Sequence, residues 1–123
     1  DISKVIPFCN EMHLAYVASD LAIVRSGASS LAEISAYAIP AILVPYPFAT
    51  DDHQTLNANY YVKNGAARLI KEEQLNTDSL FSFIDELFKE DGKCYREMKT
   101  SMKNLSRVDS AEKICDKIKN LCN

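Results

Sequence analysis

The sequence has little of what marks fibrous, membrane-spanning or secreted chains. Its 123 residues include three glycines and four prolines, too few for a collagen-like or low-complexity protein. The longest apolar stretch, residues 34–48, is interrupted by three prolines and is shorter than the roughly 20 residues that span a bilayer. Neither a basic nor an apolar segment follows Asp1, so we predict no transmembrane helix and no signal peptide. We expect the chain to be a piece of a longer protein.

The sequence also lacks an excess of positive charge and clustered metal ligands. The net charge is -3 and the isoelectric point is about 5.3, which argues against a protein that binds nucleic acid. The four cysteines form no CxxC pair and only two histidines accompany them, so we predict neither a metal site nor a cofactor. Cys115 and Cys122 are seven residues apart on one face of a predicted helix, and we expect them to be reduced thiols packed in a core.

The remaining pattern is that of one α/β domain. With 47% hydrophobic and 25% charged residues, a chain of this length can bury a core without disulfides. In the first seventy residues short apolar runs alternate with helical patterns, which indicates βαβ units and a parallel sheet. The predicted strands are residues 4–8, 21–24, 41–45 and 66–70. The predicted helices between them are residues 11–19, 29–38 and 54–63, and the last of these ends at a C-cap glycine, Gly65.

Three further helical patterns follow, and we expect these helices to cover the sheet. They are residues 78–90, 93–106 and 110–121. Thr77 and Asp109 are suitable N-caps for the first and the third, and Gly92 separates the first from the second. The basic residues of the middle helix fit either a solvated face or contact with anionic lipid. Four strands are fewer than the ~5–6 of a typical sheet, so we expect the missing strands to lie upstream.

The loop after the second predicted strand is suited to an anion. In an open parallel sheet, ligands bind outside the carboxyl ends of the strands. This loop has small residues and leads directly into a helix, so backbone N–H groups and the positive end of the helix dipole can face a phosphate or diphosphate. Its residues are Arg25, Ser26, Gly27, Ala28, Ser29 and Ser30. It has neither the GxGxxG pattern of dehydrogenases nor the lysine of a P-loop. Either of the last two serines would serve equally as a plain N-cap.

An acidic residue, Glu33, lies one helical turn inside the same helix. It is on the face that carries residues 29 and 30. Its carboxylate can accept two hydrogen bonds from the diol of a ribose. It also has the S-x-x-E spacing of a capping box with Ser30, which would make its role structural. The sequence leaves both alternatives open.

The loop after Pro45 leads into a helix whose first turn is polar. Gln54 and Asn57 are three residues apart on one face, and their amides supply both donors and acceptors for sugar hydroxyls. The structural alternative is capping, with Asp51 as the N-cap and Gln54 reaching back to it. His53 lies beside them, but no nucleophile or third group is spaced to make it a general base.

Together these motifs resemble the C-terminal domain of the bacterial MurG glycosyltransferase family, the N-acetylglucosamine transferases that make lipid II. The resemblance rests on RSGA at residues 25–28 with Glu33, PAILVPYP at 40–47, DHQ at 52–54 with NA at 57–58, and FCNEM at 8–12 with Asp20. It implies an α/β fold, a Rossmann-like parallel sheet with flanking helices, in a two-domain GT-B enzyme. Residues 1–123 would then be the UDP-GlcNAc-binding domain, incomplete at its N-terminal end, and the acceptor domain would be absent from this chain.

The resemblance also implies what each loop binds. The residues that contact uracil match Phe8, Cys9 and Asn10. The helix start at residues 28–30 faces the diphosphate, and Glu33 holds the ribose. The residues that face the sugar match His53, Gln54 and Asn57. The implied reaction is inverting transfer of GlcNAc from UDP-GlcNAc to lipid I, which gives lipid II for peptidoglycan synthesis without a metal ion.

The same resemblance implies a peripheral enzyme on the cytoplasmic face of the bacterial plasma membrane. Lipid I and the candidate general base would belong to the absent domain, so we do not expect this chain alone to catalyse transfer. One departure is Phe48, at a position where many relatives carry histidine. Two other functions remain open: a soluble noncatalytic subunit of a split GlcNAc transferase, and a UDP-sugar 2-epimerase or similar GT-B enzyme.

Overall fold

Three short parallel strands form the sheet at the centre of the domain. The computed structural model describes residues 2–121. The strands are β1 (Ala22–Val24), β2 (Ala41–Leu43) and β3 (Ala67–Leu69), paired in the order β1-β2-β3. Ala41 of the central strand aligns with Ala22 on one side and with Ala67 on the other. Each strand lies inside a predicted apolar run, and the predicted Rossmann-like α/β fold is confirmed.

Helices α1 (Met12–Val17), α2 (Ala28–Ala36) and α3 (His53–Lys63) alternate with these strands. All three agree with the predicted helices to within two residues at each end. Gly65 has the left-handed φ of 71° that glycine adopts most readily, and its N–H donates to the Val62 carbonyl at 2.9 Å. The predicted C-cap glycine is therefore confirmed. Two short 3-10 turns, η1 (Thr50–Asp52) and η2 (Glu72–Gln74), complete the loops after β2 and β3.

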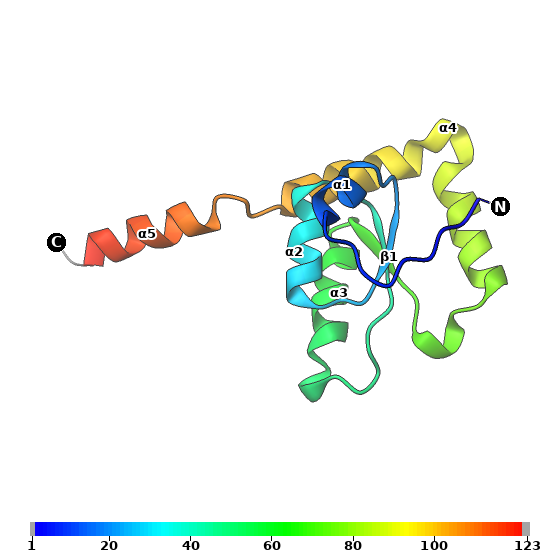
Figure 1. Ribbon diagram of the computed structural model, residues 1–123, viewed down its shortest axis with the longest axis horizontal. Helices are drawn as coiled ribbons and strands as arrows, with labels where there is room; N and C mark the ends of the chain where they lie inside the picture. Colours follow the sequence, from blue (N-terminus) through cyan, green and yellow to red (C-terminus); the bar gives the residue numbers. More distant parts are fainter. Residues whose placement is uncertain (1, 122–123) are drawn as a thin grey trace.

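The central strand β2 is buried between two layers of helices (Figure 1). Successive side chains of a strand point to opposite faces, so Ala41 and Leu43 pack on one side and Ile42 on the other. The first side is covered by α2, α3 and the end of α4, whose core residues include Leu31, Ala58 and Met102. The second side is covered by the preceding part of α4, with Phe83, Leu87 and Met98. An apolar run without polar alternation is what burial on both faces requires.

Helix α4 (Thr77–Leu105) consists of two segments that meet at a sharp bend. From Lys89 to Gly92 the backbone leaves the helical region, with Gly92 at a φ of 71°. The predicted separation at Gly92 is confirmed. The predicted N-cap Thr77 is wrong, because Asn76 caps the helix: its side chain accepts from the Ser79 N–H at 2.9 Å in a reciprocal capping box. Asparagine leads threonine in the N-cap ranking, which accounts for the shift by one residue.

Helix α5 (Ser110–Leu121) extends away from the rest of the domain in Figure 1. None of its residues is buried, and Cys115 is exposed. The predictions that this helix covers the sheet and that Cys115 packs in a core are therefore wrong; Cys122 lies outside the described residues. An amphipathic pattern shows that a helix has an apolar face but not what that face contacts.

The predicted first strand, residues 4–8, is also wrong. The segment is irregular, and Val5 is 96% exposed. A strand requires hydrogen bonds from a neighbouring strand, and within residues 2–121 β1 pairs only with β2. Pro7 also lacks the N–H that a strand partner would need. The described part of the sheet therefore has three strands instead of the four predicted.

Candidate functional site

Ser26 ties the loop after β1 to the start of α3. Its side chain is fully buried, and its hydroxyl donates to the backbone carbonyl of Gln54 at 2.8 Å. In return, the Asn57 side chain donates through Nδ2 to the Ser26 carbonyl at 3.2 Å. Two segments that are about thirty positions apart in the chain are therefore joined by a pair of hydrogen bonds. This junction places two predicted site loops side by side at the carboxyl edge of the sheet.

The amide of Gln54 fixes the loop after β2. Its Oε1 accepts from the Tyr46 N–H at 3.0 Å. Helix α3 has Asp52 as its N-cap, in a left-handed conformation and without a side-chain hydrogen bond. The alternative in which Asp51 caps the helix and Gln54 reaches back to it is therefore wrong. Within residues 2–121, Nε2 of Gln54 and Oδ1 of Asn57 make no hydrogen bond, which leaves one donor and one acceptor at this edge.

Helix α2 begins without a side-chain cap. Gly27 is its N-cap, and the first helical hydrogen bond runs from the Leu31 N–H to the Gly27 carbonyl at 3.0 Å. Ser29 and Ser30 therefore lie inside the first turn, and neither caps the helix. The N–H groups of residues 28–30 donate to no other group within the described residues. A Cβ on Gly27 would meet no atom within 4 Å, so the backbone here is open to an approaching ligand.

Glu33 has a partner other than the predicted capping serine. Its Oε2 accepts from the Tyr16 hydroxyl at 2.5 Å, and the ring of Tyr16 packs against Tyr37 at a centroid distance of 5.3 Å. The hydrogen bond to this carboxylate raises the pKa of Tyr16 to about 12. The capping box of Ser30 with Glu33 is absent, because Ser30 is not at the N-cap position. Glu33 is exposed on the second turn of α2.

Arg25 joins the loops that follow all three strands. Its Nη1 donates to the Val44 and Pro45 carbonyls at 3.4 and 3.2 Å and to Oε2 of Glu72 at 2.9 Å. Its guanidinium also lies over the Tyr46 ring, 5.6 Å from the centroid. The guanidinium lowers the pKa of Glu72 through this hydrogen bond. The structure thus brings Arg25 together with Ser26 and Gln54 as a framework for the edge.

Three partners of the predicted site residues could not be predicted from the sequence. They are Tyr16, Tyr46 and Glu72. Each contacts a predicted site residue across at least eight positions of sequence, and no local spacing signals such a pair. The only available hint was that Glu72 follows a predicted strand, as the other site loops do.

The residues that the resemblance assigns to uracil binding lie apart from the framework of Arg25, Ser26 and Gln54. Phe8, Cys9 and Asn10 belong to the irregular segment before α1, and Phe8 is 76% exposed. No hydrogen bond or ring contact within the described residues joins them to the other predicted site residues. His53 is the first residue of α3 and is exposed.

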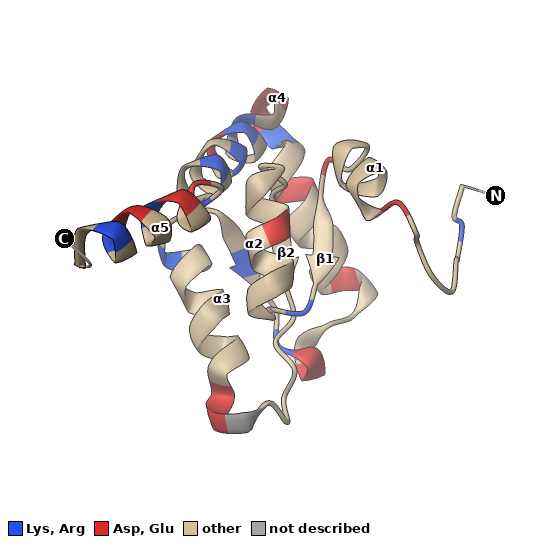
Figure 2. Ribbon diagram, turned by 60° about the vertical axis from the view of Figure 1, so that its left-hand side comes forward, with Lys and Arg blue, Asp and Glu red and all other residues tan. Residues whose placement is uncertain are grey.

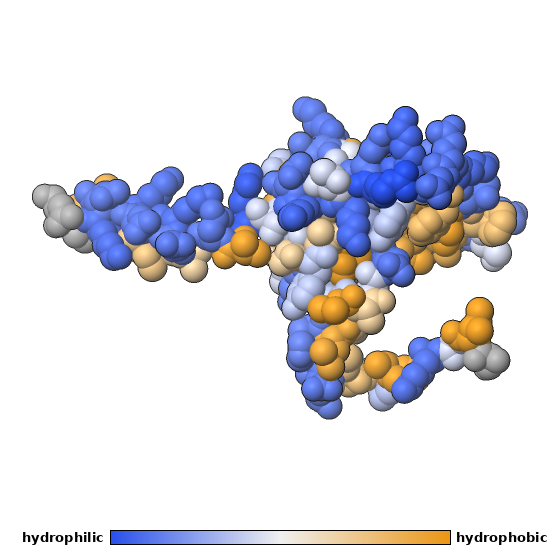
Figure 3. Space-filling view, turned by 90° about the horizontal axis from the view of Figure 1, so that it is seen from above, coloured by the Kyte–Doolittle hydropathy of each residue, from blue (hydrophilic) through white to orange (hydrophobic). Residues whose placement is uncertain are grey.

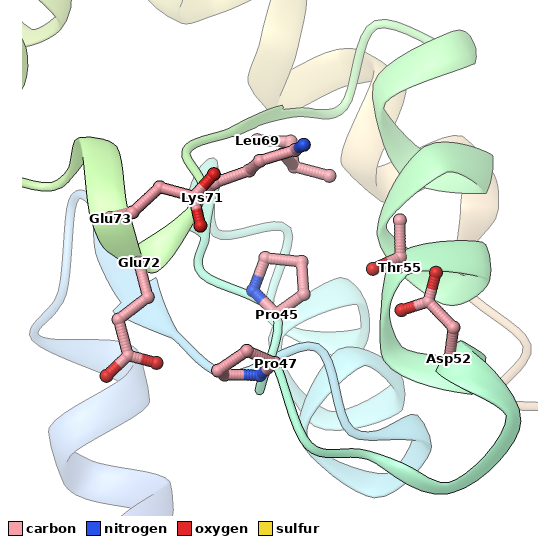
Figure 4. A pocket seen from close by; sticks show the side chains of 8 residues that line it. All are labelled: Pro45, Pro47, Asp52, Thr55, Leu69, Lys71, Glu72 and Glu73. Atoms are coloured by element: carbon pink, nitrogen blue, oxygen red, sulfur yellow. The ribbon is translucent and has the colours of Figure 1, made fainter.

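A pocket of about 260 Å³ opens beside the loop after β2 (Figure 4). Its lining residues come from the loops after β2 and β3 and from the start of α3: Pro45, Pro47, Asp52, Thr55, Leu69, Lys71, Glu72 and Glu73. The predicted site residues do not line it, while Glu33 borders a different pocket of about 380 Å³ with Tyr37 and Tyr61. The uncapped start of α2 and the two amides line neither of these pockets.

Between residues 2 and 121, no group of three or more histidine, cysteine or acidic side chains is arranged to hold a metal ion. In the same part of the chain, no helix is long and apolar enough to cross a membrane.

The fold and this edge define a Rossmann-like domain with its ligand-binding loops at the carboxyl end of a parallel sheet. Comparison with known families makes this more specific. Residues 1–114 match the model of the glycosyltransferase family 28 C-terminal domain. The chain belongs to this family, and its three-stranded parallel sheet with flanking helices is the fold of a C-terminal domain of the GT-B type.

Two similar proteins from different bacteria have the same enzyme name. The chain is 45% identical over 104 residues to the UDP-N-acetylglucosamine--N-acetylmuramyl-(pentapeptide) pyrophosphoryl-undecaprenol N-acetylglucosamine transferase of Halothermothrix orenii, covering 85% of this chain and 28% of the relative. It is 43% identical over 112 residues to the enzyme of the same name from Methylococcus capsulatus, covering 91% and 31%. A crystal structure of Acinetobacter baumannii MurG superposes with a TM-score of 0.82 at 29% identity, covering 95% of this chain and 33% of that chain. The chain therefore spans about a third of the length of these relatives.

Proposed function

We propose that this domain is the donor-binding half of an inverting transferase that moves GlcNAc from UDP-GlcNAc to lipid I, giving lipid II in peptidoglycan synthesis. The relatives' name describes such a transfer to a pyrophosphoryl-undecaprenol-linked muramyl pentapeptide. Because the chain aligns with less than a third of each of these relatives, the acceptor site and the general base would belong to the rest of the enzyme. That part would also contact the cytoplasmic face of the plasma membrane.

The uncapped start of α2 is the observation that supports this proposal most directly. Its three outward N–H groups and the positive end of the helix dipole attract a diphosphate. Gly27 has no side chain to block the approach. In an inverting transfer the acceptor hydroxyl attacks the anomeric carbon while the bond to UDP breaks, and negative charge develops on the β-phosphate. N–H groups fixed in advance stabilise that charge in the transition state.

The neighbouring residues fit the other parts of UDP-GlcNAc. The free Nε2 of Gln54 and Oδ1 of Asn57 supply a donor and an acceptor for GlcNAc hydroxyls, with His53 beside them. Glu33, one turn along α2, supplies a carboxylate for the ribose diol. The backbone of the Phe8–Asn10 segment would contact the uracil. Arg25 and Ser26 would contribute to donor binding indirectly, because their hydrogen bonds hold the ligand-binding loops together.

Substitution of Glu33 by glutamine in the full-length enzyme tests the nucleotide site. Glutamine keeps the shape and one acceptor but removes the charge, so the KM for UDP-GlcNAc should rise by roughly 10- to 150-fold, the equivalent of about 1.5–3 kcal/mol for a hydrogen bond to a charged group. The melting temperature should hardly change, because Glu33 caps no helix and glutamine can still accept from Tyr16. Steady-state kinetics and thermal unfolding measure the two effects.

Glu97→Gln is the matched control, since Glu97 is an exposed acid on α4 with no ion pair within the described residues. It should leave the KM unchanged. UDP should compete with UDP-GlcNAc at comparable affinity in calorimetry. An unchanged KM in Glu33→Gln together with failure of UDP to compete would contradict the nucleotide site. Epimerisation of UDP-GlcNAc without acceptor would point to the epimerase alternative.

A further inference from the structure

The carboxylate of Glu33 is held from outside its own helix. Tyr16 belongs to α1, which precedes β1, and its hydroxyl donates to Oε2 of Glu33 at 2.5 Å. The Tyr16 ring is half-buried and is itself packed against the ring of Tyr37, which follows the last turn of α2. The donor is therefore fixed by an aromatic contact and the acceptor by a helix. An exposed glutamate on a helix would otherwise rotate among several side-chain conformations.

This hydrogen bond leaves most of the carboxylate free. A carboxylate offers about four lone-pair positions on two oxygens, and the Tyr16 hydroxyl uses one of them. Oε1 has no partner within residues 2–121. A phenol is protonated at neutral pH, and the bond to Glu33 raises the pKa of Tyr16 further, to about 12, so the hydroxyl remains a donor. Two hydroxyls of a diol can therefore donate to the same carboxylate while Tyr16 stays bound.

We propose that Tyr16 is a positioning residue for the nucleotide site: its hydroxyl holds the Glu33 carboxylate in the orientation that accepts the ribose diol of UDP-GlcNAc. This inference rests on the proposed function, because it needs Glu33 to contact the ribose. A side chain that is already ordered loses less conformational entropy when the ligand binds, and that difference appears as affinity. The ribose is remote from the reacting anomeric carbon, so the gain applies equally to ground state and transition state.

Tyr16→Phe in the full-length enzyme removes only the hydroxyl. The KM for UDP-GlcNAc should rise by roughly two- to ten-fold, as expected when one immobilised side chain becomes free, while kcat stays unchanged. Tyr60→Phe is the matched control, because Tyr60 lies on α3, is not a predicted site residue, and its hydroxyl makes no hydrogen bond within residues 2–121. This control should leave both constants unchanged.

Two further measurements separate positioning from a general structural effect. With the 2′-deoxyribose analogue of UDP-GlcNAc, which has no diol, Tyr16→Phe should cost much less affinity than with UDP-GlcNAc itself. In a Glu33→Ala background, where no carboxylate remains to be oriented, Tyr16→Phe should change the KM little, so the two effects should be non-additive. Thermal unfolding of each variant checks that the fold is retained.

Three results would overturn the inference. They are an unchanged or lower KM in Tyr16→Phe, an equal loss with the deoxy analogue, and an undiminished loss in the Glu33→Ala background. A lower KM would mean that Tyr16 competes with the ribose for the carboxylate. If Glu33→Gln weakens binding but Tyr16→Phe does not, only the positioning role fails. If Glu33→Gln has no effect and UDP does not compete, the proposed function fails as well.

Discussion

Ser26 shows how a single small side chain can organise a site. It is one of two buried polar residues within the described chain. Its hydroxyl donates its hydrogen bond to the backbone carbonyl of Gln54, at the start of α3. The sequence predicted that Ser26 lies in a ligand loop, because the spacing after a strand is a local property. It did not predict the partner, Gln54, or the pairing of Tyr16 with Glu33. Such contacts depend on how the chain folds back, which local patterns do not encode.

Ser26→Ala should lower the free energy of unfolding by about 1 kcal/mol, the usual contribution of a buried hydrogen bond. The Gln54 carbonyl would lose a donor, and the loop after β1 would lose one of its two links to α3. Ser29→Ala serves as the control, because Ser29 is exposed and its hydroxyl makes no hydrogen bond within residues 2–121. Urea unfolding of both variants measures the difference; equal stability would show that this link carries no folding energy.

At the scale of elements, α2 and α4 begin in opposite ways. Helix α4 has a reciprocal capping box between Asn76 and Ser79, whereas α2 begins at Gly27 with no side-chain cap. The sequence left open whether Ser29 or Ser30 caps α2 or faces a ligand, since serine leads the N-cap ranking. The length of the loop after β1 decides against a serine cap, because Gly27 is the last residue with extended backbone angles. A helix whose start is left uncapped keeps its N–H groups available for a ligand.

Gly27→Ser should therefore change the stability of the domain and its affinity for UDP in opposite directions. Serine can adopt the φ of -67° found there, and its hydroxyl can cap the first turn, so the domain should gain a few tenths of a kcal/mol in stability. The same hydroxyl would occupy an N–H group and the open space in front of it, so UDP should bind more weakly. Chemical unfolding and UDP titration of the full-length enzyme measure the two effects.

The control for this change is Asn76→Ala, which removes the existing cap of α4. It should cost about 1 kcal/mol of stability without changing UDP affinity. Tighter UDP binding in Gly27→Ser would contradict the assignment of the diphosphate to the start of α2.

At the scale of the whole molecule, α5 is the helix that extends away from the domain without packing on the sheet. Figure 2 shows acidic and basic residues interspersed along it, and Figure 3 shows a row of apolar side chains on one side. Ile114 and Ile118 are each more than half exposed. The sequence predicted the helix correctly from its periodicity. It could not predict its position, because the surface that would receive an apolar face need not belong to the same domain.

Removal of residues 108–123 should leave the thermal stability of the remaining domain unchanged. None of the residues described in α5 is buried, so the deletion exposes no apolar core to water. The measurement is the melting temperature of the domain with and without these residues. A matched deletion that continues to residue 98 removes the buried Met98 and Met102 and should be strongly destabilising. A clear loss of stability in the shorter deletion would show that α5 contributes to folding.

The position of β2 decides how slowly the centre of the domain exchanges its amide hydrogens with deuterated water. Its neighbours β1 and β3 both pair with it, and helices cover its two faces. We therefore expect its amides to exchange only when the sheet as a whole comes apart, so that their rate reports the free energy of global unfolding. The amides at the uncapped start of α2, which face solvent, exchange in the folded state, so a bound diphosphate would register there as protection.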